Sequence, residues 1–161
     1  MINFKQFHES KFYNDTLHPS FWSATGGFDQ VVREKLLTIA YDVAAAAGVD
    51  ELIEDIQLTG SMANYNYTEY SDLDTHILLD FDKVNNDEDL VKKALDGKRF
   101  IWNLRHNIKM GGQDVEIYFQ DVDEPHNASG LYSLLRNEWI TEPVYNEPQV
   151  DERDVILKAD R

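Results

Sequence analysis

LTGSMANYNYTEYSDLDTHILLDF, residues 58–81, is the stretch on which the predicted fold rests. It begins as an apolar segment that ends at Gly60-Ser61, continues through a polar connection, and returns as a segment in which apolar and polar residues alternate. Because successive side chains point to opposite faces of a strand, Asp72 and Asp74 should lie on the same face. We therefore expect a strand, a turn and a second strand that opens with two carboxylates.

The turn and the two carboxylates predict neighbouring sites for an anion and a metal ion. Exposed backbone N–H groups in a turn of small residues bind anions, and paired carboxylates supply the hard oxygen ligands that Mg²⁺ prefers. A further expected strand, DVEIYFQ at residues 114–120, has Asp114 and Glu116 on its polar face. If the apolar faces of both strands rest on helices, Asp72, Asp74 and Glu116 converge on the open side. They would repel one another there unless a divalent cation held them together.

Length and composition indicate one ordinary globular domain. The chain has 161 residues, of which 42% are hydrophobic, and it has no cysteine, so disulfides and thiolate metal sites are excluded. The N-terminus has no apolar core flanked by basic residues, and no apolar run approaches the roughly 20 residues needed to span a bilayer. We therefore expect a cytoplasmic protein with no membrane partner.

The charge is strongly negative but unevenly distributed. Fifteen basic and 30 acidic residues give a net charge of −15. This balance argues against a protein that binds along the phosphate backbone of a long nucleic acid. Residues 91–110, however, contain six basic side chains and the single acid Asp96. This segment fits either a small local polyanion such as a nucleotide or a solvated helix face that balances neighbouring acids.

The expected elements follow from hydrophobic periodicity and turn signals. They are helices at residues 28–47, 87–107 and 128–140, strands at 53–59, 73–81 and 114–120, a short docking helix at 3–13, and an extended C-terminal wrap after residue 140. This order predicts an α/β (α+β mixed) fold, in which a short mixed sheet has helices packed on one face. The core of the single domain should span about residues 28–140.

The motifs resemble those of the DNA polymerase β-like nucleotidyltransferase superfamily. Its pattern is a Gly-Ser turn, an Asp-x-Asp between apolar residues, and a later acid flanked by apolar residues. The matching elements are Gly60-Ser61, Asp72-Leu73-Asp74 and Val115-Glu116-Ile117. Residues 102–120 and 124–140 also look like small predicted nucleotidyltransferases of tailed phages, which would place the protein in the host cytoplasm. The resemblance covers about residues 55–145.

The resemblance implies a minimal nucleotidyltransferase fold and a metal-dependent reaction. Backbone amides of Gly60 and Ser61, with the Ser61 hydroxyl, would hold the β- and γ-phosphates of a nucleoside triphosphate. Asp72 and Asp74 would bind Mg²⁺ or Mn²⁺. Glu116 would be the third acid, preferred over its competitor on the same strand because it has an apolar neighbour on each side. An acceptor hydroxyl would attack the α-phosphorus in line and release pyrophosphate.

Four further residues are candidate nucleotide contacts. Arg105 and Lys109, in the basic segment, could bind phosphate. Ser129 and Tyr132, in the segment after the third strand, could close over the nucleotide, although a turn capping the next helix explains Ser129 equally well.

Several alternatives stay open at the level of sequence. The acceptor would be a protein side chain, a small molecule or an RNA 3′ end, with the acidic surface ranking RNA below the other two. A rival interpretation is a catalytically weak nucleotide-binding module or an antitoxin-like module that binds a partner protein. A homo-oligomer is compatible with either.

The remaining polar and aromatic candidates each have two interpretations. Tyr65, Tyr67 and Tyr70 would stack on a base or pack as ordinary loop aromatics. His76 would orient a carboxylate or serve as a structural histidine.

Overall fold

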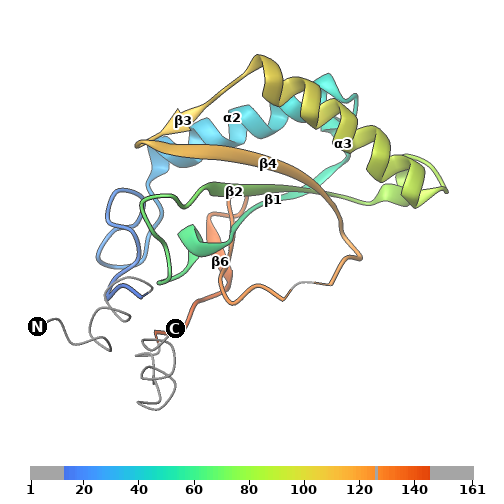
Figure 1. Ribbon diagram of the computed structural model, residues 1–161. Coiled ribbons are helices and arrows are strands. Elements are labelled where there is room, and N and C mark those ends of the chain that lie inside the picture. The colour runs from blue at the N-terminus through green and yellow to red at the C-terminus, as the bar shows by residue number, and fades with distance from the viewer. Residues whose placement is uncertain (1–12, 126, 146–161) are drawn as a thin grey trace, which may run out of the picture.

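The structure is a computed structural model that describes residues 13–125 and 127–145 (Figure 1). Its helices and strands are α2 (Gln30–Ala46), β1 (Ile53–Thr59), β2 (Leu73–Leu79), α3 (Glu88–Arg105), β3 (Lys109–Met110), β4 (Gln113–Asp121), β5 (Leu131–Ser133) and β6 (Glu138–Thr141), with short 3₁₀ turns η1 (Asp50–Leu52), η2 (Ser61–Ala63) and η3 (Phe81–Lys83). Apart from residue 13, the expected docking helix lies outside the described residues. So does the C-terminal wrap beyond residue 145.

The strands form one mixed sheet in the order β3-β4-β2-β1-β5-β6. Only β2 and β4 are parallel, and α3 makes the crossover between them. The other neighbours are antiparallel. Figure 1 shows α2 and α3 together on one side of the sheet, where α2 packs against β1 and β2 and α3 packs against β4. The expected α/β class, with a short mixed sheet and helices on one face, is confirmed.

Both long helices begin at an aspartate that caps free backbone N–H groups. Asp29 Oδ1 accepts from the Val32 N–H at 2.9 Å, and Asp87 Oδ1 accepts from the Leu90 N–H at 3.1 Å. Their bounds lie within two residues of the predicted helices 28–47 and 87–107. Among the described residues, no helix has the length and apolar composition needed to cross a membrane.

The two faces of β2 differ as the alternation predicts. Leu73, Ile77 and Leu79 are fully buried in the core between sheet and helices. Asp74 and His76 point to the other face and are half-buried. The same alternation continues on β4. The sheet therefore has one apolar face, which the helices cover, and one polar face on the side away from the helices.

The predicted helix at residues 128–140 is wrong, because this segment forms β5, a turn and β6. The spacing of Leu131, Leu134 and Leu135 imitates a helix. Tertiary structure overrides it, since β1 has a free edge that β5 occupies. Asn137, with φ of 58°, takes the left-handed conformation that turns the chain back. The short strand β3 was also not predicted.

Candidate metal centre

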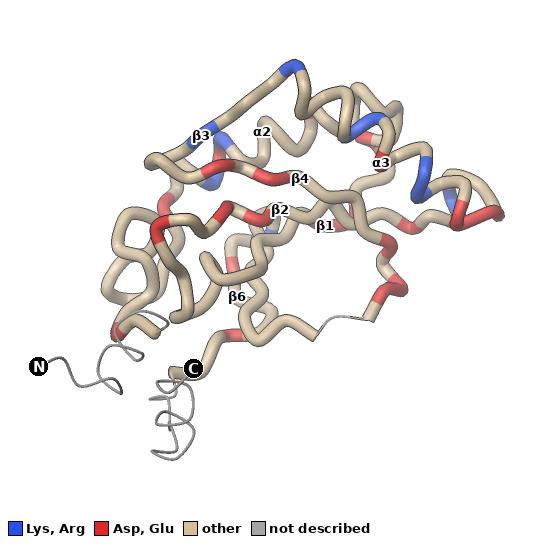
Figure 2. Tube along the Cα trace, viewed as in Figure 1, with Lys and Arg blue, Asp and Glu red and all other residues tan. Residues whose placement is uncertain are grey.

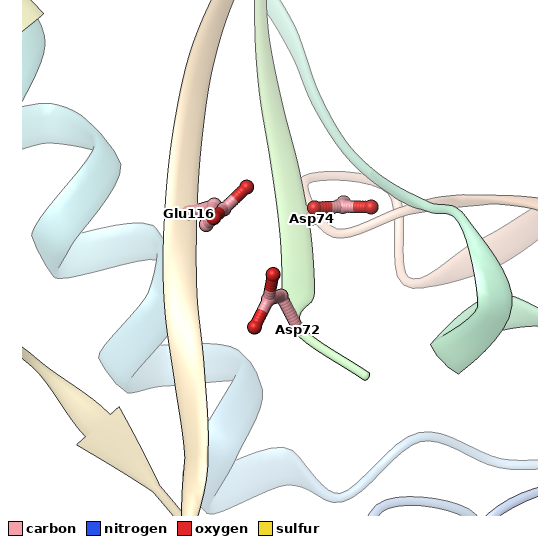
Figure 3. Close-up of side chains that lie close together, drawn as sticks. All are labelled: Asp72, Asp74 and Glu116. Atoms are coloured by element: carbon pink, nitrogen blue, oxygen red, sulfur yellow. The ribbon is translucent and has the colours of Figure 1, made fainter. Parts of the chain in front are cut away.

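Asp72, Asp74 and Glu116 lie together on the polar face of the sheet (Figure 3). One carboxylate oxygen from each lies within 4.8 Å of those of the other two. The parallel pairing of β2 with β4 places Asp74 directly opposite Glu116, and Asp72 immediately precedes β2. All three side chains are half-buried, so they are held by the sheet and remain accessible. These are the three acids predicted from the sequence.

Burial and neighbouring negative charges make Asp72 and Asp74 resist ionisation. Burial raises the pKa of Asp74 to about 6, and the charges of Glu116 and Asp72 contribute. The pKa of Asp72 is also raised, first by burial, then by Glu116 and by Asp114. Such shifts mark an excess of negative charge that a cation would relieve. The donor set consists of hard carboxylate oxygens, which fits Mg²⁺ or Mn²⁺ and does not suit soft metals.

The raised pKa of Asp74 predicts a pH-dependent loss of stability in the metal-free protein. The folded-state pKa of about 6 exceeds the ordinary aspartate pKa of 3.8, so the folded state holds this proton more tightly than the unfolded state. The penalty from Asp74 is absent below about pH 4 and complete above about pH 6. Asp74→Asn should therefore stabilise the metal-free protein at pH 7 by about 1 kcal/mol, after allowance for solvent screening, and not at pH 4.

Urea unfolding in a chelator at both pH values measures this difference. The exposed helical Asp42 provides the matched control, because Asp42→Asn removes a similar charge without this crowding. An Asp74→Asn variant whose stability follows that of the wild type in parallel over the whole pH range would contradict the expectation.

The Gly60 turn contacts the carboxylate cluster directly. Gly60 has φ of 78° and ψ of −165°, a conformation that essentially only glycine adopts. A Cβ atom at this position would collide with Oδ2 of Asp74. Ser61 Oγ donates to Ser71 Oγ at 2.7 Å, which ties the turn to the residue before Asp72. The N–H groups of Ser61 and Met62 donate to no acceptor in residues 13–125 or 127–145. They are available to an anion beside the cluster.

Other segments hold the η2 turn in place. Trp22 Nε1 donates to the Met62 carbonyl oxygen at 2.9 Å. Asn64 Nδ2 donates to Ser129 Oγ. Gly130 packs so closely that a Cβ atom there would overlap the carbonyl oxygen of Ala63. The predicted nucleotide contact Ser129 therefore lies against the η2 turn, next to Gly130 in the sequence.

Two side chains next to the cluster were not among the predicted site residues. The Tyr118 hydroxyl donates to Glu116 Oε2, and this bond is the main reason that the pKa of Tyr118 is raised to about 12. The Arg99 guanidinium lies 4.8 Å from the centre of the Tyr118 ring. The spacing of Glu116 and Tyr118 does place both on one strand face. No sequence signal indicates Arg99, because its position depends on how α3 packs over β4.

The predicted phosphate-binding residues of the basic segment are only partly near the cluster. Lys109 Nζ pairs with Asp114 Oδ1 at 3.7 Å. The charge of Asp114 in turn acts on Asp72, so Lys109 is linked to the cluster only through Asp114. The two candidates for the third acid therefore differ in their partners. Asp114 pairs with Lys109, whereas Glu116 lies with Asp72 and Asp74 in the cluster. Arg105 is exposed at the end of α3 and forms no ion pair within the described part of the chain.

Tyr132 lies away from the carboxylates. It pairs with Leu58 on β1, whose side chain belongs to the apolar face, and directly opposed residues share a face. Its side chain is only 4% exposed and its ring contacts Trp22. Its hydroxyl donates to Asn137 Oδ1 at 2.7 Å. The position of Tyr132 is that of a core residue and gives no support to the predicted nucleotide contact.

The loop tyrosines differ from one another. Tyr65 packs between Tyr13 and Tyr145, and Tyr67 donates to the Thr16 carbonyl oxygen at 2.9 Å. These two are packing residues. Tyr70 is 84% exposed, close in sequence to Asp72.

His76 has neighbours of its own on the polar face. Its Nδ1 lies 2.7 Å from Gln120 Oε1 and its ring 5.2 Å from that of Tyr118. His76 therefore packs against Tyr118, whose hydroxyl donates to Glu116.

Comparisons with protein-family models, with curated proteins and with solved structures give no match to this chain. The arrangement of the carboxylates and the turn is therefore the basis on which a function can be argued.

Proposed function

We propose that this protein is a Mg²⁺-dependent nucleotidyltransferase, which moves a nucleoside monophosphate from a nucleoside triphosphate to an acceptor hydroxyl. The observation that carries the proposal is the cluster of Asp72, Asp74 and Glu116, with oxygens within 4.8 Å of one another, in contact with the Gly60 turn. When bound, a divalent cation neutralises phosphate charge and favours the ionised form of a nearby hydroxyl.

The residues around the cluster have complementary tasks. Asp72 and Asp74 would bind the cation together with phosphate oxygens of the substrate. The N–H groups of Ser61 and Met62, which donate to no acceptor among the described residues, would donate to the phosphates beyond the α-phosphorus. Glu116, held by the Tyr118 hydroxyl, would accept the proton of the attacking hydroxyl or bind a second cation.

The reaction balances with these groups alone and a bound cation. The acceptor oxygen forms a bond to the α-phosphorus, and the bond from that phosphorus to the bridging oxygen breaks. Pyrophosphate leaves with the electron pair of the broken bond. Positioning and charge neutralisation supply most of the catalysis, since no covalent enzyme intermediate is required.

The net charge of −15 bears on the acceptor. A long RNA would be repelled by most of the surface, because gripping its backbone requires clustered basic residues. A protein side chain or a small molecule is the better acceptor, and the RNA 3′ end ranks below both.

Transfer of label from nucleoside triphosphates tests the proposal. The protein, Mg²⁺ or Mn²⁺ and a cell lysate are incubated with each triphosphate, labelled in parallel experiments at the α- and at the γ-phosphate. We expect the α-label to join an acceptor, the γ-label to appear in pyrophosphate, and a chelator to abolish both. Transfer of the γ-label to the acceptor would mean phosphoryl transfer and would contradict the proposal. So would an absence of α-label incorporation with every triphosphate.

A further inference from the structure

The outer face of α3 is apolar and exposed. Leu90, Phe100, Ile101 and Leu104 are 54%, 62%, 48% and 72% exposed, although the opposite face of the helix already contributes Val91, Leu95 and Trp102 to the core. With Ala94 and Gly97, the exposed Leu90, Ile101 and Leu104 follow the sequence spacing 90, 94, 97, 101 and 104, and Phe100 lies beside them. Alternating steps of four and three residues form a continuous stripe along one side of a helix, which is the pattern of a seam between two helices.

Gly97 lies at the centre of this stripe. Glycine in the middle of a helix destabilises it by roughly 0.5–1 kcal/mol relative to alanine, so its presence calls for a reason. A Cβ atom at Gly97 would meet no atom within 4 Å among the described residues. No contact with the residues that the structure describes requires glycine here. A second helix that crosses α3 at this point would require glycine, because the missing side chain lets the two backbones approach closely.

The charges along α3 indicate the orientation of such a second helix. With its capping residue, the first half of the helix (residues 87–96) has four acidic and two basic side chains, whereas the second half (residues 97–105) has three basic side chains and no acidic one (Figure 2). A second α3 running in the opposite direction would place each acidic end beside a basic end. The helix dipoles would also be antiparallel, which is favourable. A parallel arrangement would bring like ends together.

In an antiparallel pair with a two-fold axis at Gly97, each residue before Gly97 faces the residue at the same distance after it in the other copy. Leu90 precedes Gly97 by seven residues and Leu104 follows it by seven. We propose that the protein forms a homodimer in which α3 packs antiparallel against α3 of a second copy, with the helices crossing at Gly97. Leu90 of each copy then contacts Leu104 of the other.

This interface leaves the carboxylate cluster free. α3 covers the apolar face of the sheet, and Asp72, Asp74 and Glu116 lie on the other face (Figures 1 and 3). The dimer would present two separate sites, and its existence does not depend on the proposed function.

Single cysteines give a sharp test, because the chain has none of its own. A disulfide requires Cα atoms about 4.4–6.8 Å apart. Gly97→Cys should therefore form covalent dimers on mild oxidation. Leu90→Cys mixed with a differently tagged Leu104→Cys should give mainly the mixed dimer. Val31→Cys on α2, where Val31 is 61% exposed, is the control that should remain unlinked. Dominant links between two Leu90→Cys chains would overturn the antiparallel arrangement.

Light scattering after size exclusion measures the assembly without cross-linking. The wild type should have twice the 18.7 kDa mass of the chain. Leu104→Asp should raise the dimer dissociation constant at least about tenfold, because it places an unpaired charge against Leu90 of the other copy. Its circular dichroism should be unchanged, because this side chain is 72% exposed. Val31→Asp should remain dimeric. A monomeric wild type, or a Leu104→Asp variant as dimeric as Val31→Asp, would overturn the proposal.

Discussion

Asp72→Asn and Asp74→Asn should each lower the rate of nucleotidyl transfer by about 10²- to 10³-fold, a size typical of losing one electrostatic contact to the reacting groups. Each change replaces a charged ligand with a neutral amide of nearly the same shape. The sheet positions Asp74 by pairing it with Glu116, so the fold should survive the change. The loss should therefore appear in metal binding and in catalysis, and not in folding.

Pyrophosphate release and calorimetric titration with Mn²⁺ would be measured on the same preparations. Asp42→Asn, on the exposed face of α2, is the matched control and should behave as the wild type. Unchanged pyrophosphate release in both site variants would refute the proposed function. A different result would favour a nucleotide-binding or partner-binding module: the wild type releases no pyrophosphate, but it binds Mn²⁺ more tightly than the two site variants do.

Gly130→Ala should destabilise the protein by about 2–4 kcal/mol, which is within the range of severe overpacking. The new methyl group would overlap the carbonyl oxygen of Ala63. That atom belongs to the backbone of η2, which cannot move aside as a flexible side chain can. Because η2 begins at Ser61, a displaced backbone would also disturb the proposed phosphate-binding N–H groups.

Urea unfolding at pH 7 measures the change in the free energy of unfolding. Gly97→Ala, measured at a protein concentration at which the wild type is monomeric, is the control with the same chemical change, since its methyl group would meet nothing within 4 Å in the described chain. It should be as stable as the wild type or up to about 1 kcal/mol more stable, because alanine favours the helix. A Gly130→Ala variant as stable as Gly97→Ala would show that the approach to Ala63 is not tight.

The part of the structure predicted from sequence is the part that short-range patterns determine. Alternation fixed the faces of β2 and β4, so Asp72, Asp74 and Glu116 could be expected on one side of the sheet. The bounds of α2 and α3 followed from apolar periodicity and turn signals to within two residues, and the structure shows that Asp29 and Asp87 cap N–H groups at their starts.

The features that were missed depend on which distant segments meet. Residues 131–135 have helical spacing, yet pairing with the edge of β1 makes part of them a strand. The same pairing turns Tyr132 towards the core. The place of Arg99 over Tyr118 depends on the packing of α3, and nothing in the sequence around either residue specifies it.

The parallel pairing of β2 and β4 has a consequence for how this chain can change length. Asp74 faces Glu116 because two strands are in register, and α3 with its flanking loops connects them without contributing a ligand to the cluster. Insertions or deletions in the loops that flank α3 therefore leave the carboxylates opposed. A single-residue deletion within β4 before Glu116 would rotate that acid to the opposite face of the sheet. Variation in length should be tolerated in the crossover and eliminated in the strands.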